Sequence, residues 1–344
     1  MIRIRPFRAP ADYQALAPLL GTTVDRLDAE DAALPATDAL TTGPDGRLTG
    51  HGRIRLLAED RTGRPVGYAT AWRAPWTPPG DLASHYALAT PDVQPPPAAT
   101  DVLPPPAGVP ATACTRIPRA GTLTSTDVLL PLADALTTWA RTAGATRLLT
   151  ELPDTRLDAL PALLDRGHTV DAHIRTASTT LRPSPAPLPE PPAGIRFTTL
   201  ATTTVTDPAQ RLHALYLATL PDNPGFADAL PDYEQWHTEV LAGPAFRPDW
   251  IHLAEHTGRL VAVAAAHATP DPYTCHLTYA AVARPWRGRG LARTLKLHAT
   301  DHLAHAGLRT AHTEVAAANT PMTALTTALG YTWHPGHHRL VLPL

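Results

Sequence analysis

Cysteine is almost absent from this sequence, and long apolar runs are missing altogether. The two cysteines, Cys114 and Cys275, lie far apart and fit no metal-ligand spacing, which argues against a disulfide framework or a zinc site. No apolar run reaches the roughly 20 residues that cross a bilayer, and the N-terminal MIRIRPFRAP lacks the apolar segment of a signal peptide. We therefore expect a cytoplasmic protein without a metal.

A strong net charge is also lacking. The 29 basic and 31 acidic residues give a formal net charge of −2, without long runs of like charge. Such a surface does not attract phosphate backbones or anionic lipids, so nucleic acid and membranes are not expected as partners. Lysine is rare among the basic residues, whereas proline is abundant, with 39 copies. At 344 residues the chain is long enough for two ordinary domains.

One proline-rich segment divides the chain. Residues 182–194, RPSPAPLPEPPAG, cannot form a regular helix or an interior strand, because proline lacks the amide donor and restricts the preceding residue. We expect a semi-rigid linker there, between a first domain at 1–181 and a second at 195–344. Another proline-laden stretch, at about 75–118, is expected to form a long loop inserted in the first domain.

The two halves share local sequence patterns. Residues 56–71 and 252–266 both read as a strand, a glutamate, a Thr-Gly-Arg turn and a second strand, which is the pattern of a β-hairpin. Near the end of the first half, the segment around Gly167 matches the segment around Gly330. These matches indicate that one fold has been duplicated and has diverged.

The most informative segment is the hexamer Arg287-Gly288-Arg289-Gly290-Leu291-Ala292. It follows an apolar strand-like stretch, 277–282, and precedes a stretch, 291–306, whose apolar residues recur at helical spacing. A glycine-rich turn of this kind exposes backbone N–H groups at the positive end of a helix dipole, where phosphate binds well. Gly288 and Gly290 allow an anion to approach closely, and the arginines add charge-assisted hydrogen bonds. The spacing matches neither the dinucleotide-binding nor the P-loop fingerprint.

The segments after this turn complete a longer pattern. A predicted strand at 309–315 is followed by Asn319, Met322 and the closing Leu329-Gly330-Tyr331. The order of strand, RxxGxA turn, helix, strand, asparagine, short helix and Leu-Gly-aromatic resembles the acetyl-CoA-binding half of the GCN5-related N-acetyltransferases (GNAT). The whole chain resembles tandem GNAT proteins organised like mycothiol synthase. The resemblance implies an α/β fold of the α+β kind, with two tandem GNAT folds, each a mixed, mostly antiparallel sheet flanked by helices.

The resemblance implies that acetyl-CoA is the acyl donor, and it assigns binding roles in the second half. Residues 280–282 would lie on the strand that pairs with the pantetheine arm, and the turn would offer its N–H groups to the pyrophosphate. In the first half, Gly121 is the nearest glycine before the predicted helix at 126–143, so cofactor binding is not expected there. The cofactor-binding residues are then Ala280, Ala281, Val282, Arg287, Gly288, Arg289, Gly290, Leu291, Ala292, Arg293 and Asn319.

Acyl transfer from a thioester to an amine needs a base for the amine, donors for the carbonyl oxygen and a proton for the thiolate. His276 is our candidate for the base, because an imidazole titrates in the useful range. Strict alternation along the strand predicts that it faces the same side as Thr278, Ala280 and Val282. The alternative is a strand histidine that caps a loop or meets solvent.

Other groups could take part in the proton transfers. Glu314, near the end of the strand expected to splay from the cofactor strand, is an alternative base. In many GNAT relatives a tyrosine protonates the thiolate, but here the corresponding residue is Thr326, whose hydroxyl is far too weak an acid. Tyr279 or Tyr331 could replace it, although Tyr331 stands where relatives have a core aromatic. The catalytic candidates are His276, Tyr279 and Glu314.

Two further patterns are interpreted as structural. Glu255 lies beside a hairpin turn and has a twin, Glu59, at the same place in the first half. His298, His302 and His305 share one face of the predicted helix and could hold a metal. Because no carboxylate or cysteine completes a ligand set, we interpret them as a solvated face.

The acceptor site is expected within residues 220–250, where Asp222, Asp228, Asp232 and Glu234 would suit a cationic amine unless they form an ordinary solvated face. The sequence thus predicts an acetyl-CoA-dependent N-acetyltransferase, a monomer or homodimer, that acts on a small-molecule primary amine. The alternatives are a catalytically silent acyl-CoA-binding protein and a protein or peptide N-acetyltransferase, because one fold can host many acceptors.

Overall fold

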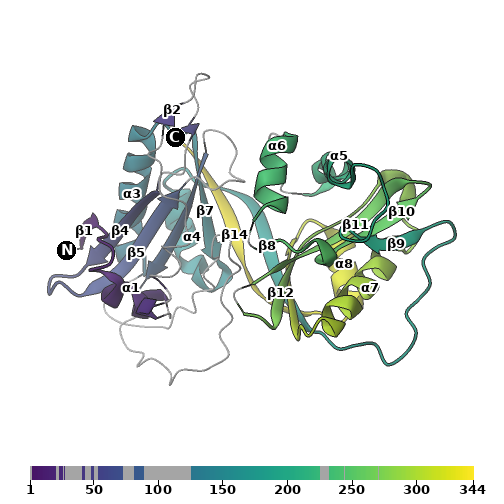
Figure 1. The fold of residues 1–344 in the computed structure, drawn as a ribbon. Coiled ribbons are helices and arrows are strands. Elements are labelled where there is room, and N and C mark those ends of the chain that lie inside the picture. Colours follow the sequence, from purple (N-terminus) through teal and green to yellow (C-terminus); the bar gives the residue numbers. More distant parts are fainter. Residues whose placement is uncertain are drawn as a thin grey trace. The chain divides into compact units, whose positions relative to one another are not determined.

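The structure is a computed structural model, and its described residues form two compact units (Figure 1). Of the described residues, the first unit holds those up to Asp171 together with His337–Leu344, and the second holds Ala172–Gly336. The predicted linker at 182–194 falls inside the second unit. The described residues are 2–20, 23–25, 27, 41–42, 48–49, 53–72, 81–88, 125–224, 232–243, 245–269 and 271–344.

The sheet of the first unit has the strand order β1-β4-β5-β6-β7-β14. All its neighbours are antiparallel except β6 and β7, which are parallel. A separate small hairpin is formed by β2 (Thr41–Thr42) and β3 (Leu48–Thr49). The strands of the sheet are β1 (Arg3–Pro6), β4 (Arg53–Glu59), β5 (Pro65–Trp72), β6 (Asp81–Leu88), β7 (Arg147–Pro153) and β14 (Thr332–Pro343). The helices are α1 (Tyr13–Leu20), α3 (Ser125–Thr142), a 3-10 helix (Asp154–Ala159) and α4 (Leu160–Leu164).

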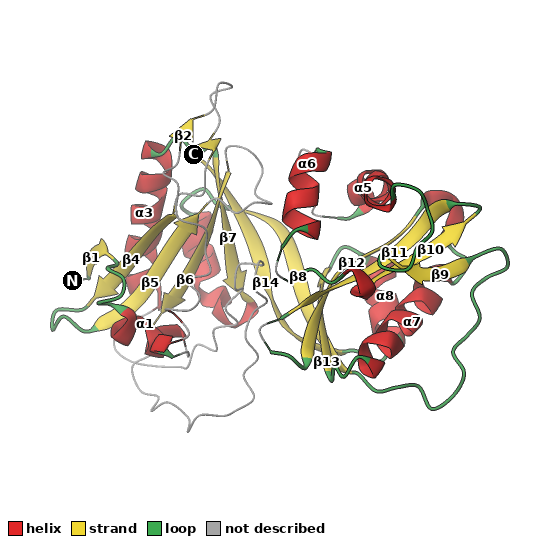
Figure 2. Cartoon of the chain, in the orientation of Figure 1, coloured by secondary structure: helices red, strands yellow, loops and turns green. Residues whose placement is uncertain are grey.

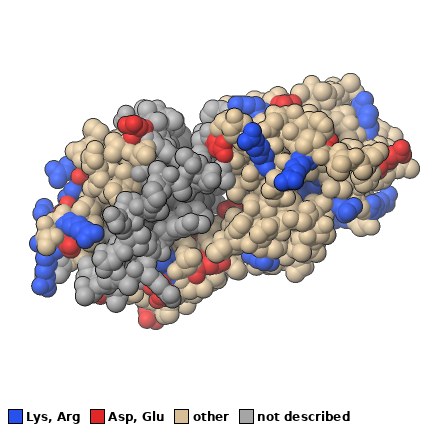
Figure 3. Space-filling view, turned by 90° about the horizontal axis from the view of Figure 1, so that it is seen from below, with Lys and Arg blue, Asp and Glu red and all other residues tan. Residues whose placement is uncertain are grey.

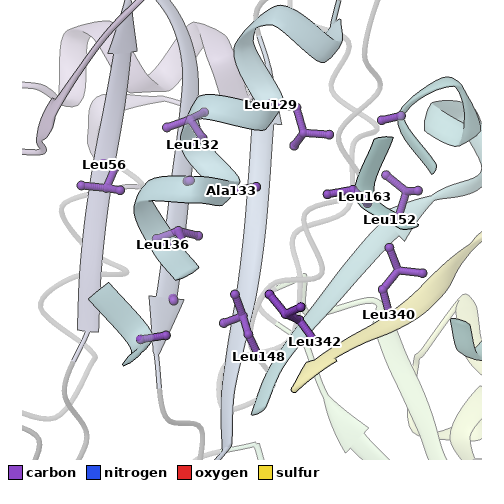
Figure 4. Packing of buried hydrophobic residues seen from close by; sticks show 14 of the residues in the cluster. Leu56, Leu129, Leu132, Ala133, Leu136, Leu148, Leu152, Leu163, Leu340 and Leu342 are labelled. Carbon is purple, nitrogen blue, oxygen red and sulfur yellow. The ribbon is translucent and has the colours of Figure 1, made fainter. Parts of the chain in front are cut away.

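Helix α3 covers this sheet with one apolar stripe, as its helical spacing of apolar residues predicts. The core around it joins side chains from β4, β5, β7, α4 and β14 (Figure 4). Two of these side chains, Leu340 and Leu342, come from the last strand of the chain, and both are buried. The labelled members of the core are Leu56, Leu129, Leu132, Ala133, Leu136, Leu148, Leu152, Leu163, Leu340 and Leu342.

The two halves of the sequence exchange their last strands. Strand β8 (Thr169–Thr180) ends the first half, yet its residues 174–180 pair with β13 (Thr310–Ala316) of the second unit. Strand β14 ends the second half, yet its residues 337–343 pair with β7 of the first unit. Neither half of the sequence therefore contains all the strands of its own sheet, and both halves are needed for either unit to be complete.

The sheet of the second unit has the order β14-β8-β13-β12-β11-β10-β9, and only β12 and β13 run parallel among the pairs with described registers (Figure 2). Both sheets are mixed and mostly antiparallel, as the sequence predicted. The remaining strands are β9 (Arg196–Thr199), β10 (Ile251–His256), β11 (Arg259–Ala268) and β12 (Thr274–Val282). The helices are α5 (Pro208–Thr219), α6 (Tyr233–Trp236), continued by a π-helix (His237–Leu241), α7 (Leu291–His305) and α8 (Thr320–Ala328), with 3-10 turns at Leu220–Asp222, Pro248–Trp250 and Arg284–Trp286.

Helices cover both faces of the second sheet. On one face, Leu291, Leu295 and Ala299 of α7 pack against the small residues Ala262 and Ala264 of β11. On the other face, α5 and α6 pack on the alternate residues of the strands. This second cluster includes Leu212, Leu215, Trp236, Leu253 and Val263. The period-two alternation of β10 and β11 thus sends one set of side chains to each helical layer.

One expectation about the first half was wrong. The stretch at about 75–118 was predicted to be a loop, but β6 (Asp81–Leu88) lies within it and pairs with both β5 and β7. The surrounding prolines argue against a strand in the local sequence. Strand β6 forms because it pairs with β5 and β7, which lie elsewhere in the chain. The rest of the stretch and Gly121 lie outside the described residues. Across the described ranges, no helix is both long and apolar enough to span a membrane.

Candidate active site

The turn predicted to bind phosphate joins β12 to α7. Gly288 and Gly290 have φ values of 72° and 75°, in the left-handed region that glycine adopts without a steric penalty. Apart from the adjoining residues, no atom lies within 4 Å of the place where a Cβ would stand at either glycine. Within the described part of the chain, the N–H groups of residues 288–293 have no hydrogen-bond acceptor. These N–H groups at the start of α7 are therefore free to bind an anion.

Two arginines beside this turn are already paired. Arg284 and Arg287 both donate to the carboxylate of Asp222, with 2.9 Å from Arg284 Nε and 2.6 Å from Arg287 Nη2 to Asp222 Oδ2. Arg287 Nε also donates to the carbonyl of Val282 at 2.8 Å. The hydrogen bonds from Arg284 and then Arg287 hold the pKa of the Asp222 carboxyl well below its usual range. The expectation that Asp222 offers a free negative charge to a cationic amine is therefore wrong.

Two other arginines of the turn have no carboxylate partner among the described residues. Arg289 lies over the ring of Trp286, with 5.0 Å from its guanidinium carbon to the ring centroid. Arg293, in the first turn of α7, is exposed. On the face drawn in Figure 3, basic side chains occur in small groups rather than in one extended patch. Within this turn, Arg289 and Arg293 are therefore the cations that could pair with an anion.

The remaining acidic residues of the predicted acceptor segment give little support for a cationic pocket. Asp228 lies outside the described residues. Asp232 is exposed and already has an interaction partner, and Glu234 is exposed. Asn223, another residue of this segment, contacts Asn319, because its Oδ1 accepts a hydrogen bond from Asn319 Nδ2 at 3.3 Å.

A β-bulge interrupts the cofactor strand. Across β11 and β12, Ala265 lies opposite Tyr279, whereas the next residue, Ala266, lies opposite Leu277. Thr278 is therefore an extra residue with no partner in the ladder. Because side chains alternate along a strand, one extra residue exchanges the two faces for everything beyond it.

This bulge corrects the predicted orientation of His276. The residues on either side of it, Cys275 and Leu277, both pack under α7, so His276 faces the opposite layer. Tyr279 and Ala281, beyond the bulge, belong to that same layer, with α5 and α6. Strict alternation had placed His276 with the wrong set of residues. That set is Thr278, Ala280 and Val282.

Beyond this point β12 and β13 separate. The two strands pair from Thr274 with Thr310 to Leu277 with Thr313, although β12 continues to Val282 and β13 to Ala316. The last residues of β12, including Ala280 and Ala281, therefore have an unpaired backbone edge on the β13 side in the described structure. An extended chain with amide groups can pair with such an edge.

His276 lies in the middle of three histidines on neighbouring strands. It is directly opposite His267 of β11 and directly opposite His312 of β13. Each ring has one buried nitrogen without a hydrogen-bond partner in the described structure: Nε2 of His267, Nδ1 of His276 and Nε2 of His312. The sequence alone does not single out the two outer histidines, because only the strand register brings them beside His276.

Burial, followed by the nearby His312 and His267 rings, lowers the pKa of His276 to about 4. Burial also lowers the pKa values of His267 and His312. At neutral pH the imidazole of His276 is thus uncharged and can accept a proton, but it is a weaker base than an ordinary histidine. The expectation that it titrates like a free imidazole is corrected.

Tyr279 and Glu314 lie on the same face of the sheet as His276. The Tyr279 hydroxyl is 2.8 Å from Thr219 Oγ1, and Thr219 donates its own proton to the carbonyl of Leu215 at 2.7 Å. Tyr279 is therefore the donor to Thr219, and burial raises its pKa. Glu314 is exposed on the splayed part of β13 and already has an interaction partner. The structure thus places the three predicted catalytic residues on one face beside the opening.

The residues at the end of the pattern lie mainly in the protein interior. Asn319 caps α8, because its Oδ1 accepts a hydrogen bond from the N–H of Met322 at 3.2 Å. Thr326 is 0% exposed, and its hydroxyl has no partner among the described residues. Tyr331 is also buried, and burial raises its pKa, so it is not a ready proton donor.

The patterns interpreted as structural make structural contacts. Glu255 is buried and accepts hydrogen bonds from Thr198 at 2.5 Å, Thr203 at 2.6 Å and Arg196 at 2.6 Å. Its twin, Glu59, binds Arg5 Nε at 2.8 Å.

The histidines of α7 bind neighbouring groups. His298 Nε2 lies 2.8 Å from the carbonyl of Pro189, and the His302 ring lies 5.0 Å from that of His252. His305 Nδ1 lies 3.3 Å from Asp301 Oδ2. The first of these contacts fastens the proline-rich segment to the outer side of α7.

Comparison with known families agrees with this geometry. Residues 203–331 match the family described as "Acetyltransferase (GNAT) family". This match covers the turn, the splayed strands and the three predicted catalytic residues, and it supports a GNAT acetyltransferase assignment. A search of curated proteins found no significant match.

Solved structures show the same fold over the full chain. A GCN5-related N-acetyltransferase from Sphaerobacter thermophilus has a TM-score of 0.65 at 16% identity, over 99% of this chain and 95% of that one. A tandem GNAT protein from the clavulanic acid biosynthesis pathway has a TM-score of 0.55 at 17% identity, over 100% and 98%. The glucosamine N-acetyltransferase region of a fungal multi-domain β-N-acetylglucosaminidase has a TM-score of 0.59 at 13% identity, over 99% and 38%. The fold is that of two tandem GNAT domains.

Proposed function

We propose that this protein is an acetyl-CoA-dependent N-acetyltransferase that acetylates a small-molecule primary amine, and that the second half is the catalytic one. The family match implies acyl transfer from an acyl-CoA. The observation that carries the finer proposal is the turn at 288–293, whose N–H groups have no acceptor among the described residues. These N–H groups stand beside Arg289 and Arg293, which have no carboxylate partner among the same residues. We further propose that the two halves follow the mycothiol synthase type of organisation, in which the first half has lost the cofactor site.

In this proposal the chain holds the co-substrate at two places. Residues 288–293, with Arg289 and Arg293, bind the phosphates, and the unpaired edge of β12 from Ala280 to Val282 binds the amides of the arm. When bound, acetyl-CoA supplies an activated acyl group as a thioester. Asn319 acts mainly as the cap of α8 and orders the far side of the opening through Asn223.

His276 is the proposed base. It faces the α5 and α6 layer, where the acceptor would enter, and its buried Nδ1 has no partner in the described structure. An uncharged imidazole there can accept the proton that the amine loses on attack. Tyr279, whose proton is donated to Thr219, is proposed to orient the acceptor by accepting a hydrogen bond through its hydroxyl oxygen, and Glu314 is the second candidate for the base.

The second candidate function is a catalytically silent acyl-CoA-binding protein. It is favoured by one observation, namely that Thr326, at the place of the family's usual acid, is fully buried. Such a protein would bind acetyl-CoA through the same turn without turnover.

Two linked measurements test the proposal. Isothermal titration of the full chain with acetyl-CoA should give one site per chain. Primary amines, including amino sugars such as glucosamine, are then screened with acetyl-CoA. An acceptor should cause the release of free CoA, and mass spectrometry should detect the acetylated amine. Two equivalent binding sites would contradict the assignment of the second half. Tight binding without product from any amine would favour the silent protein.

A further inference from the structure

Lys296 is the only lysine in the chain, where every other long basic residue is an arginine. It lies on α7 and is only 5% exposed. An arginine keeps its proton under all physiological conditions, whereas a lysine can release it, particularly when buried. The single buried lysine can therefore release a proton, which the arginines of this chain cannot do.

The surroundings of Lys296 contain no partner for its charge. Its Nζ lies 5.5 Å from the centroid of the Tyr331 ring, and it makes no hydrogen bond or ion pair with the described residues. The titratable group that contacts it from another element is Tyr331, which in turn interacts with Cys275. Burial keeps both of these groups uncharged by raising their pKa values, that of Cys275 to about 12. Burial lowers the pKa of Lys296 to about 8.

The packing of α7 places Lys296 level with the opening between the strands. Leu291 and Leu295 pack in the cluster of Val282, near the end of β12. Leu303, further along α7, packs in the cluster of Leu277, where β12 leaves β13. Lys296 lies between these two contacts, on the face of the sheet opposite to His276.

We propose that Lys296 is the general acid of the transfer, replacing the tyrosine that Thr326 does not provide. This inference rests on the proposed function. As the C–N bond to the acceptor forms and the C–S bond breaks, the Lys296 ammonium gives one proton to the departing sulfur, and the base on the other face takes one proton from the amine. Lys296 then regains a proton from water, and the base releases one, so protons balance over the cycle.

The acid strengths suit this transfer. A thiol titrates near about 8.5, and a proton moves most readily between groups of similar pKa at a working pH close to both. The ammonium of Lys296 falls in this range. The proposed acid and base also stand on opposite faces of one opening, so the two proton transfers do not compete for the same space.

The first test observes Lys296 directly. Growth with lysine labelled at the ε-carbon and ζ-nitrogen should give one side-chain lysine signal in the full chain, because the sequence has one lysine. We expect this signal to titrate near pH 8 and to shift more with CoA than with desulfo-CoA, which lacks the thiol. A signal that responds equally to both ligands would overturn the placement of Lys296 at the sulfur.

The second test uses variants. Lys296→Met and Lys296→Arg should each lower kcat by roughly 10²- to 10⁴-fold, with acetyl-CoA affinity within a few-fold of the wild type. The arginine variant separates two roles of Lys296, because an arginine keeps the positive charge but does not release its proton. Thr326→Val is the control and should keep full activity.

Three outcomes would contradict the role of Lys296. Wild-type turnover in a folded Lys296→Met variant would show that Lys296 is not the general acid. Full activity of the Lys296→Arg variant would show the same. A stable acetyl group on Lys296 in the mass spectrum would mean that its amine attacks the thioester instead. A wild-type chain that fails to bind acetyl-CoA would contradict the proposed function as a whole, whereas the thiol comparison concerns Lys296 alone.

Discussion

Strands β4 to β7 of the first unit and β10 to β13 of the second have the same order and the same directions. In each unit the single parallel junction joins the last two of these strands over four residue pairs, Asp81–Ser84 with Arg147–Thr150 and Thr274–Leu277 with Thr310–Thr313. In each unit both strands then continue beyond their pairing. The opening between splayed strands is thus common to both halves and does not by itself make a site.

The residues beside the opening differ. The three register positions that hold His267, His276 and His312 in the second unit are held by Trp72, Ala83 and Leu149 in the first. The described pairing of β5 with β6 also runs without a shift, whereas β12 has the bulge at Thr278. The second unit has therefore kept polar groups and an irregular strand where the first has apolar residues and a regular one.

The helices that follow the openings differ as well. Helix α3 has an acidic residue, Asp127, in its first turn, whereas α7 has none and carries Arg293 there. A carboxylate at a helix N-terminus interacts favourably with the helix dipole and so competes with a bound anion. The start of the helix thus favours a bound anion in the second half and disfavours one in the first.

The glycine-rich turn before α7 should give the largest of these effects. We expect Gly290→Asp to abolish phosphate binding at this turn. The change places a carboxylate where phosphate would bind, and aspartate tolerates the left-handed backbone better than most residues. We expect acetyl-CoA binding to fall below detection in calorimetry, with the unfolding temperature little changed.

Gly258→Asp is the matched control, since Gly258 has a φ of 74° and no atom within 4 Å of a built Cβ outside its neighbours. It lies in the hairpin turn between β10 and β11 and should leave binding intact. Unchanged affinity in Gly290→Asp would show that phosphate binds elsewhere and would bring the first half back into consideration.

The second difference is the set of three neighbouring histidines, His267, His276 and His312. His276→Ala should lower kcat by roughly 10²- to 10⁴-fold, because the amine then loses its base, while acetyl-CoA affinity stays the same. Since the pKa of His276 is about 4, the rate that depends on it should decline only as the pH falls through that region, well below an ordinary imidazole. The measurement is kcat/KM against pH.

His252→Gln is the control for this variant, because His252 is also a buried strand histidine with a lowered pKa but lies on the α7 side of the sheet. It should keep its turnover. A fully active His276→Ala variant would transfer the role of base to Glu314 or to water.

Much of this architecture could be predicted from local sequence. The hairpins, the turn and helix α7 follow from apolar periodicity and from glycines with positive φ, which are properties of neighbouring residues. The twin glutamates Glu59 and Glu255 were found because a duplicated sequence repeats its structural contacts. A cytoplasmic location and the oligomeric state stay predictions.

What the sequence could not give depends on long-range pairing. The bulge at Thr278 is defined only by the register against β11, and it reverses the side that His276 faces. The neutralisation of Asp222 needs the 3-10 turn after α5 to meet the turn before α7. The exchange of β8 and β14 joins residues far apart in sequence, and no local pattern encodes it.

The smallest predicted effect concerns stability in acid, where the halves should also differ. Among the residues that the structure describes, burial lowers the pKa values of four histidines in the second unit and of one in the first. The four are His252, His267, His276 and His312, and the one is His168. An unfolded chain binds protons at these groups below about pH 6.5, and the folded chain does not. Their stabilising effect is therefore complete above that pH and is lost as the pH falls toward the folded values, about 4 for His276 and about 3 for His252.

Each of these two groups should cost on the order of 1 kcal/mol of stability at pH 5.5 relative to pH 7.5. Hydrogen exchange, corrected for the intrinsic effect of pH, should show a larger loss of protection in β10 to β12 than in β7 and α4. His252→Gln should lessen that loss, because a glutamine cannot bind the proton. Equal losses in both units would mean that the exchanged strands couple the units into one cooperative structure, so that protonation in the second destabilises the first to the same extent.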